Sequence, residues 1–164
     1  MTSAAVADPV TKMMDWDRAA AWRRSQSGRL VFTNGVFDLL HPGHVDVLLA
    51  SRRQGDALVV GVNSDESVKR LKGPDRPIRS LSDRAYVLAA LSMVDAVVAF
   101  EQDTPLELIL RLRTDVLVQG GDYTVETIVG AQEVHGWGGR VAVVPLTPGQ
   151  STTSIIQRLR GNDA

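Results

Sequence analysis

The stretch FTNGVFDLLHPGHVDVLLAS, residues 32–51, passes from an apolar segment through a glycine into a segment with helical spacing. Gly35 allows the backbone to come close to a ligand or to adopt a positive φ. The Pro-Gly pair at 42–43 favours a sharp entry into a helix, because proline suits the first helical turn. Two of the chain's three histidines, His41 and His44, stand at this crossing. The stretch therefore predicts a strand-to-helix connection that presents two imidazoles together.

The same alternation of strand and helix continues along the chain. The strand-like runs are apolar and rich in valine, and they span Leu30–Phe32, Ala57–Val62, Ala96–Phe100, Val116–Val118 and Arg140–Pro145. Helical patterns fall near residues 43–54, 82–92, 104–112, 126–135 and 152–160. Runs without polar alternation are typical of strands buried on both faces, and alternation with helices is typical of a parallel sheet. The predicted fold class is α/β, a single Rossmann-like domain with a five-stranded parallel sheet and helices on both faces.

The N-terminal segment, residues 1–27, is expected to lie outside the main domain, which spans residues 28–164. Residues 1–12 are small, polar and interrupted by a proline, which predicts a loose tail. Asp15 can cap a short helix that ends near Arg24.

Composition excludes several classes of function. The 164 residues are 44% hydrophobic and 23% charged, as in an ordinary globular domain. A net charge of −1 and only 3 Trp, 2 Tyr and 3 Phe give no basic field or stacking platform, so nucleic acid is not an expected partner. The lack of cysteine excludes disulfides and cysteine metal sites. No secretory signal and no run of roughly 18 apolar residues is present, so we expect a cytoplasmic protein with no membrane attachment.

Four polar stretches follow predicted strands. In parallel sheets of this kind, ligands bind beyond the carboxyl ends of the strands. The stretches are TNGVFDLLHPGH at 33–44, NSDES at 63–67, QGGDY at 119–123 and LTPGQSTTS at 146–154. We expect the four loops to converge on one crevice.

The histidine pair admits three interpretations. Two imidazoles near a helix start form a donor-rich pocket that suits phosphate oxygens. Alternatively, His41 caps the helix while His44 is half-buried. The third interpretation, a zinc pair, lacks support from cysteine or a nearby third histidine. The stretch also differs from the G-x-G-x-x-G fingerprint, which disfavours a redox dinucleotide.

A second anion site is indicated by GQSTTSIIQRLR, residues 149–160, where hydroxyls and free backbone N–H groups meet at a helix start. Capping alone would explain only one of these hydroxyls. The basic stretch SVKRLKGPDRPIRSLSDR, residues 67–84, is interrupted by glycine and prolines. It predicts a flexible loop that closes over a polyphosphate, or else a solvated face. Asn63 and Asp122 are expected to cap turns and also to approach the ligand.

Together these residues resemble the HxGH nucleotidyltransferases of the cytidylyltransferase-like superfamily. GVFDLLHPGH at 35–44 matches the G-x-F-D-x-x-H-x-G-H pattern, and STTSII at 151–156 matches the late phosphate-binding motif. With GVNSDESVKRLKGPDRP, VVAFEQDTPLELI and LVQGGDY, the chain is similar to the adenylyltransferase part of ADP-heptose synthase. The similarity runs from about Arg29 to Arg158, which is nearly the whole chain.

The resemblance implies transfer of AMP from ATP to D-glycero-β-D-manno-heptose 1-phosphate, giving ADP-heptose and pyrophosphate for lipopolysaccharide precursor synthesis. It implies that Mg²⁺ arrives with ATP and that the protein is a homodimer. By resemblance, the catalytic residues are His41, His44 and Lys72. The nucleotide- and phosphate-binding residues would be Asn34, Gly35, Phe37, Asp38, Asn63, Arg76, Gly121, Asp122, Ser151, Thr152 and Thr153.

The chain departs from its relatives in two ways. Many relatives carry a sugar kinase domain in front, for which this chain has no room, so a separate kinase is expected upstream. Gln119 stands where relatives often carry Lys, which removes a cation. The alternatives are a cytidylyltransferase acting on glycerol 3-phosphate or another sugar phosphate, a non-catalytic nucleotide-binding module, and a scaffold.

Overall fold

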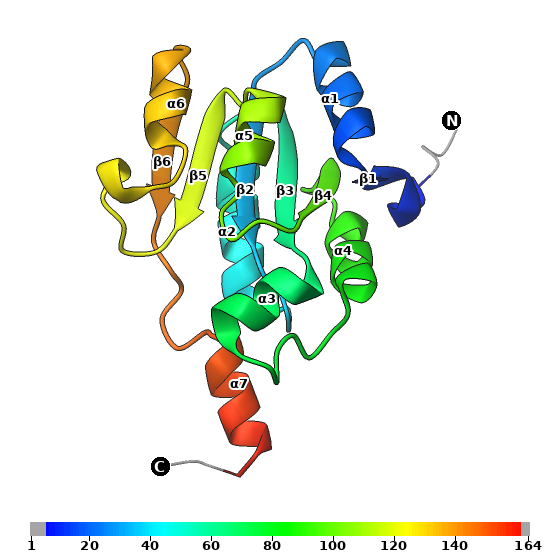
Figure 1. The fold of residues 1–164 in the computed structure, drawn as a ribbon, viewed down its shortest axis with the longest axis vertical. Helices are drawn as coiled ribbons and strands as arrows, with labels where there is room; N and C mark the ends of the chain where they lie inside the picture. The colour runs from blue at the N-terminus through cyan, green and yellow to red at the C-terminus, as the bar shows by residue number, and fades with distance from the viewer. Residues whose placement is uncertain (1–5, 162–164) are drawn as a thin grey trace.

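A parallel sheet with helices on both faces forms the body of the protein, and the computed structural model describes residues 6–161 (Figure 1). The sheet is six-stranded in the order β1-β4-β3-β2-β5-β6, and each pair of neighbours is parallel. Its strands are β1 (Met13–Met14), β2 (Leu30–Gly35), β3 (Ala57–Asn63), β4 (Ala96–Phe100), β5 (Val116–Gly120) and β6 (Arg140–Val144). The predicted fold class is therefore confirmed, with one strand more than expected.

Seven α-helices and two 3₁₀ turns connect or flank these strands within the described residues. The helices are α1 (Trp16–Ser25), α2 (Pro42–Arg52), α3 (Asp65–Lys72), α4 (Leu81–Ala90), α5 (Leu106–Leu112), α6 (Ala131–Gly136) and α7 (Thr152–Leu159). The 3₁₀ turns are η1 (Pro9–Lys12) and η2 (Val125–Thr127). The pattern predicted over 126–135 is divided, because Gly130 adopts a left-handed φ of 88° between η2 and α6.

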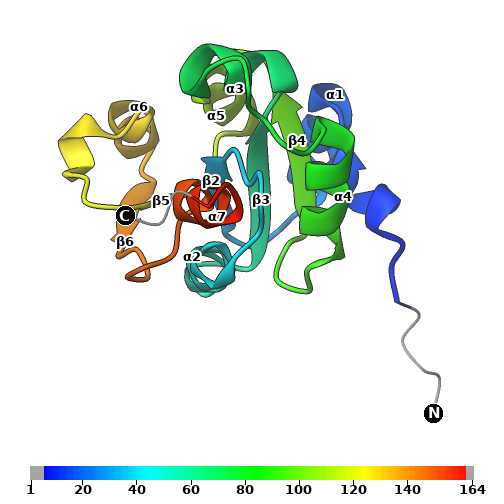
Figure 2. The same ribbon diagram turned by 90° about the horizontal axis from the view of Figure 1, so that it is seen from below.

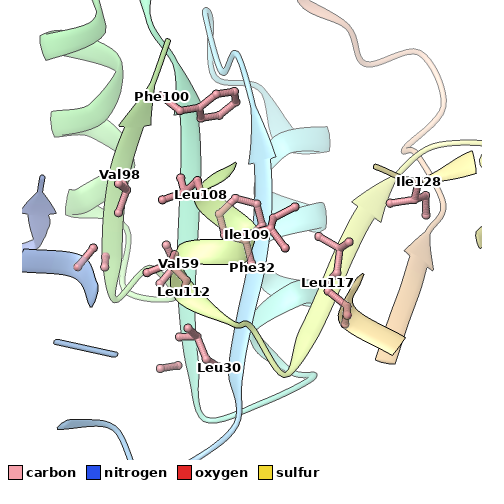
Figure 3. Close-up of a cluster of buried hydrophobic side chains, with 14 of the residues drawn as sticks. Leu30, Phe32, Val59, Val98, Phe100, Leu108, Ile109, Leu112, Leu117 and Ile128 are labelled. Carbon is pink, nitrogen blue, oxygen red and sulfur yellow. The ribbon is translucent and has the colours of Figure 1, made fainter. Parts of the chain in front are cut away.

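The two faces of the sheet carry separate apolar clusters. Because side chains alternate along a strand, β2 sends Leu30 and Phe32 to one face and Val31 to the other. The first face packs against α1, α5 and α6, where Phe32 lies among leucines and Ile109 (Figure 3). The second face packs against α2 and α4 through Leu48 and Leu88. The view in Figure 2 separates these two helical layers. Both faces of the central strands are buried, which explains their unbroken apolar runs.

The extra strand β1 lies at one edge of the sheet. Met13 and Met14 pair with Val97 and Val98 of β4. A strand of two residues has no periodic pattern, so the sequence did not reveal it. The loose tail predicted for 1–12 is wrong for residues 9–12, which form η1. Residues 1–5 of that prediction lie outside the described part of the chain.

Helix α3 corrects the prediction of a flexible basic loop over 67–84. Ser64 caps the helix by accepting a hydrogen bond from Ser67 N–H at 3.2 Å. Acidic residues occupy its first turn and basic residues its last, which suits the helix dipole. The stretch of cations is thereby divided, because Lys69, Arg70 and Lys72 belong to α3, Arg76 and Arg79 to the following loop, and Arg84 to α4.

Candidate active site

A cavity of about 340 Å³ opens beyond the carboxyl ends of β2 and β5. Strand order reverses between these two strands, since β2 continues to β3 on one side while β5 continues to β6 on the other. This is the switch point at which open α/β sheets bind ligands. In Figure 1, α7 lies beyond the lower ends of the strands.

The cavity brings together most of the residues predicted from the sequence. Those that line it are Asn34, Gly35, Phe37, Asp38, His41, His44, Lys72, Arg76, Ser151, Thr152 and Thr153. They come from the end of β2, the start of α2, the end of α3 and its following loop, and the start of α7. Segments far apart in the sequence thus meet at one site, as the four-loop prediction requires.

Three predicted residues do not line this cavity. Asn63 is buried and donates a hydrogen bond from Nδ2 to Ser67 Oγ at 3.0 Å. Gly121 has a φ of 134° and donates its N–H to Val144 O at 2.9 Å. Asp122 is exposed beside it. Their predicted contact with nucleotide stays a prediction.

Several further residues line the cavity that the sequence analysis did not name as binding residues. These are Thr33, Val36, Gly43, Val47, Gly120, Leu146, Thr147 and Gln150, and all but Val47 lie in the polar stretches expected to converge, while Gln119 was singled out only as a departure from relatives. Thr147 has a structural task, because its hydroxyl donates to Asp46 Oδ2 at 2.6 Å and ties the loop before α7 to α2. Val47 alone lies outside those stretches, and its place at the cavity follows only from the fold.

The two histidines stack on each other at the mouth of α2. Their ring centroids are 3.8 Å apart with an interplanar angle of 21°, and the Phe37 ring lies 5.2 Å from that of His44. His41 occupies the N-cap position of α2, with Pro42 opening the helix. Its side chain nevertheless forms no capping hydrogen bond within the described chain. The interpretation of His41 as a helix cap is therefore wrong.

Burial sets the charge of this pair. It lowers the pKa of His44 to about 4, with a further contribution from the neighbouring His41, and it also lowers the pKa of His41. Both rings are therefore neutral near pH 7. The Nδ1 atoms of both are buried and have no hydrogen-bond partner among the described residues. Buried polar atoms are normally paired, so these two indicate a ligand-binding surface.

Asp38 anchors the loop that borders the cavity. Its carboxylate accepts hydrogen bonds from Arg76 Nε at 2.7 Å and from the N–H groups of Ile78 and Arg79 at 2.9 Å. Burial raises the pKa of Asp38, but these hydrogen bonds and the charge of Arg76 outweigh it, so the net pKa is lowered. The pair with Arg76 is thus an ionised, structural clasp rather than a free acid.

A buried guanidinium, that of Arg84, connects the strand ends behind the site. It donates to Val36 O at 2.7 Å, Asn63 O at 2.9 Å, Asp65 Oδ1 at 2.7 Å and Arg79 O at 3.0 Å. These bonds join the ends of β2 and β3 to the loop before α4. The sequence analysis placed Arg84 in a stretch of cations interpreted as a loop or a solvated face. Leu88 lies four residues later on the same helix face and is buried, and this spacing was a signal that Arg84 faces the core.

The remaining phosphate-binding candidates lie on the rim. Ser151 caps α7 by accepting from Ser154 N–H at 3.0 Å, so its hydroxyl is explained by capping. Ser151, Thr152 and Thr153 line the cavity, so the start of α7, where a helix has free N–H groups and the positive end of its dipole, lies beside it. Lys72 ends α3 at the cavity wall, whereas Lys69 lies outside it and pairs with Glu66 at 2.8 Å. Hydrogen bonding to Glu66 raises the pKa of Lys69.

Residues 32–158 match the family model described as cytidylyltransferase-like. The chain belongs to this family. The family and the class of enzyme predicted from the sequence, a nucleotidyltransferase, are thereby confirmed. The match begins in β2 and ends in α7, so it includes every element that contributes to the cavity.

Several of the curated relatives similar to this chain are named bifunctional protein HldE, among them proteins from Acidiphilium cryptum and Syntrophotalea carbinolica. The one from Acidiphilium cryptum is 53% identical over 158 residues, covering 96% of this chain and 32% of the relative. The one from Syntrophotalea carbinolica is 58% identical over 136 residues, covering 83% of this chain and 28% of the relative. The chain thus spans about a third of the length of the curated relatives it matches.

Among solved structures, a lipopolysaccharide core biosynthesis protein from Thermoplasma volcanium has a TM-score of 0.59 and 27% sequence identity to this chain. The alignment covers 74% of this chain and 98% of that protein. This cytidylyltransferase-like fold therefore occurs in a solved protein of nearly the same extent as the matched region.

The described residues contain no group of three or more His, Cys, Asp or Glu side chains placed to hold a metal ion. Within the same part of the chain, no helix is long and apolar enough to cross a membrane. The donors of the cavity are instead imidazoles, hydroxyls, backbone N–H groups and cations, which is the chemistry of phosphate binding.

Proposed function

We propose that this protein transfers AMP from ATP to D-glycero-β-D-manno-heptose 1-phosphate, releasing pyrophosphate and forming ADP-heptose. The observation that carries the proposal is the stacked pair His41 and His44, which lines one cavity together with the start of α7. The heptose acceptor is supported by the identity of 53% and 58% to the HldE proteins. Formation of the heptose precursor of lipopolysaccharide is part of the same proposal.

The reaction needs positioning more than proton transfer. An oxygen of the acceptor phosphate, which is already ionised, attacks the α-phosphorus of ATP. A new P–O bond forms there as the bond from the α-phosphorus to the bridging oxygen breaks, and its electron pair leaves with pyrophosphate. No general base is required for this displacement. Catalysis consists of holding two polyanions together and stabilising the charge that builds on the α-phosphate and leaving group.

The cavity residues have distinct roles in this displacement. Neutral imidazoles still carry one N–H each, so His41 and His44 donate hydrogen bonds to the α-phosphate and the departing oxygen. Lys72 bridges phosphates from the wall opposite α2. The first turn of α7, with Thr152 and Thr153, holds the β- and γ-phosphates. Asn34 and Gly35 form the floor of the cavity at the end of β2.

Mg²⁺ enters as part of the substrate, the Mg·ATP complex. Asp38 is the one carboxylate among the described residues that line the cavity, and its oxygens are occupied by Arg76 and two backbone N–H groups. Phosphate oxygens and water would therefore supply the ligands of the ion, as Mg²⁺ commonly prefers. The ion adds positive charge at the triphosphate.

The deciding experiment is a pyrophosphate-release assay with ATP or CTP against a panel of sugar phosphates. We expect turnover with Mg·ATP only when heptose 1-phosphate is present, and a preference for ATP over CTP. Equal turnover of CTP with glycerol 3-phosphate would instead favour the alternative cytidylyltransferase. Binding of ATP without turnover of any acceptor would favour the non-catalytic module.

The proposal carries two expectations about partners. A sugar 1-phosphate acceptor requires a kinase that phosphorylates the anomeric hydroxyl, and we propose that a separate sugar kinase acts upstream. We also propose that the chain forms a homodimer. Sedimentation of the purified protein tests the second expectation, because a homodimer has twice the mass of 17.8 kDa.

A further inference from the structure

Phe37 has a backbone conformation that is rare for residues other than glycine. Its φ is 50°, in the left-handed region, and among the described residues only one other non-glycine, Arg113, has a positive φ. A Cβ makes this conformation unfavourable, so it persists only where the surrounding contacts impose it. Residues of this kind cluster at functional sites, and Phe37 lines the cavity.

Contacts on both sides hold the backbone of Phe37 in this conformation. The carbonyl of Val36, directly before it, accepts a hydrogen bond from Arg84 Nη1 at 2.7 Å. The carboxylate of Asp38, directly after it, accepts from the N–H of Arg79 at 2.9 Å. Arg84 Nε also donates to the carbonyl of Arg79 at 3.0 Å, so the two anchors belong to one network. The peptide units around Phe37 are thus fixed from two directions.

The ring of Phe37 contacts a glycine and a histidine of the cavity. A Cβ placed on Gly35 would come within 3.0 Å of Phe37 Cε2, so glycine at this position makes room for the ring. The ring centroid lies 5.2 Å from that of His44 with an interplanar angle of 58°, within the range of favourable aromatic pairs. The Phe37 ring therefore limits the positions that the His44 ring can occupy.

A similar contact is found at the other histidine. His41 stacks on His44, with the two ring centroids 3.8 Å apart. A Cβ placed on Gly43 would come within 3.1 Å of His41 Cε1 and Nδ1, so glycine here lets the ring approach the first turn of α2. The contacts therefore run from Gly35 through the rings of Phe37, His44 and His41 to Gly43.

Phe37 also contributes to the apolar core, since it belongs to the cluster on the face of the sheet that α2 and α4 cover. It is 6% exposed. A core role alone explains neither the left-handed backbone nor the contact with His44. Phe100 provides a comparison, because it is 2% exposed, belongs to the other apolar cluster and does not line the cavity.

We propose that Phe37 is a positioning residue, whose ring sets the orientation of His44, and through it that of His41, toward the bound phosphates. The role belongs to the side chain and adds to the predicted contact of Phe37 with nucleotide. Its consequence for catalysis rests on the proposed function, in which the two imidazoles donate hydrogen bonds to the α-phosphate and the departing oxygen.

The first measurement is a nuclear magnetic resonance titration of the histidine rings in the substrate-free protein. Burial lowers the pKa of His44 to about 4. Phe37→Leu and Phe37→Met remove the ring and admit water beside His44, so the pKa of His44 should rise by about one pH unit or more. His44→Gln assigns the resonance, and the exposed His135 is the reference. The other charged or titratable residues that line the cavity are unchanged in both variants: Asp38, His41, Lys72 and Arg76.

The second measurement is the kinetics of pyrophosphate release, with kcat expressed per folded molecule from circular dichroism. Phe37→Leu and Phe37→Met should each lower kcat roughly 10- to 100-fold, as for misplacement of catalytic groups by about 1 Å. KM for Mg·ATP should change by less than about 3-fold, because the histidines act mainly in the transition state. Phe100→Leu is the matched control and should lower the melting temperature without changing kcat or the pKa of His44.

The outcomes separate positioning from a purely structural role. An unchanged pKa of His44 in the Phe37 variants overturns the proposal, as does an unchanged kcat per folded molecule. An equal loss of kcat in Phe100→Leu also overturns it, because general damage to the core would then be the cause. Phe37→Met decides the matter if Phe37→Leu does not fold, since methionine adapts to irregular spaces. If the wild-type protein turns over no sugar phosphate, the proposed function fails, and the titration alone decides whether Phe37 places His44.

Discussion

At the scale of single residues, burial rather than charge explains the paired histidines. Two imidazolium rings 3.8 Å apart would repel each other, whereas neutral rings stack without that cost. The lowered pKa values of His41 and His44 keep both rings neutral at pH 7. Each then holds one N–H for a phosphate oxygen, and an arriving polyanion favours protonation of the pair as negative charge develops.

Removal of either histidine should impair the chemical step more than substrate binding. We expect His41→Ala and His44→Ala each to lower kcat by roughly 10²–10³, as for loss of one oxyanion donor. KM should rise much less, because the donors act mainly in the transition state. His135→Ala, at an exposed position on α6, should keep most activity. Measurements of kcat and melting temperature on the three variants distinguish a catalytic role of the two histidines from a structural one. A stable, fully active His44→Ala variant would contradict the mechanism.

The pH dependence of stability follows from the same burial. The pKa of His44 falls from 6.5 to about 4 on folding, so the unfolded chain binds more protons between these values. The free energy of unfolding should therefore decrease as pH falls from 6.5 towards 4, by about 3 kcal/mol for this residue alone. Urea unfolding at pH 7 and pH 4.5 measures the change, and His44→Gln should flatten it. An equally large loss of unfolding free energy in His44→Gln between pH 7 and pH 4.5 would show that burial of His44 is not its cause.

At the scale of elements, α3 places one lysine at the cavity and another in solvent. Lys72 ends the helix at the cavity, whereas Lys69, one turn earlier, pairs with Glu66 in solvent. Lys72→Ala should strongly reduce turnover while changing the unfolding free energy by no more than about 0.5 kcal/mol. Lys69→Ala should be nearly silent in both measurements, because an exposed ion pair contributes little. Equal, mild effects of the two substitutions on pyrophosphate release would mean that Lys72 is only a solvated cation.

Comparison of the predicted and observed elements shows which parts of the fold could be predicted from the sequence. Apolar runs and helical spacing predicted the sheet and most helices, because buried strands and amphipathic helices have strong periodic patterns. The strand Met13–Met14 was too short to have a period. Helix α3 was obscured by its charges, although Ser64 and the acidic first turn were present as start signals. The glycine and proline that follow α3 led to the prediction of a loop, although the capping residue Ser64 indicated a helix start.

The same contrast holds for the candidate site. Motifs such as HPGH and STTS predicted residues that the fold brings to one cavity, because phosphate recognition would need donors at helix starts. The residues that support them have no such signature. Asp38 lines the cavity, and its carboxylate accepts hydrogen bonds from Arg76 and backbone N–H groups, a supporting role that the motif did not reveal. Its predicted contact with nucleotide stays a prediction. Arg84 was grouped with surface cations, yet its side chain is fully buried.

At the scale of the whole molecule, the site exists only when the sheet is assembled. The cavity joins β2, α2, α3, β5 and α7, which are separated in the chain but meet at the switch point between β2 and β5. Arg84 and the Asp38–Arg76 clasp connect three of the loops that surround it. A ligand that spans these elements should therefore bind the folded state and stabilise the molecule as one unit.

Mg·ATP should raise the thermal stability of the protein, because it contacts the folded state and not the unfolded chain. At 100 times the dissociation constant the gain is about 2.7 kcal/mol, which should raise the melting temperature by several degrees. Mg²⁺ with AMP at the same concentration should give a much smaller shift, since AMP lacks the β- and γ-phosphates assigned to α7 and Lys72. In Lys72→Ala the difference between ATP and AMP should shrink. Thermal unfolding with each nucleotide measures these shifts, and equal shifts for ATP and AMP would show that the triphosphate is not held at α7.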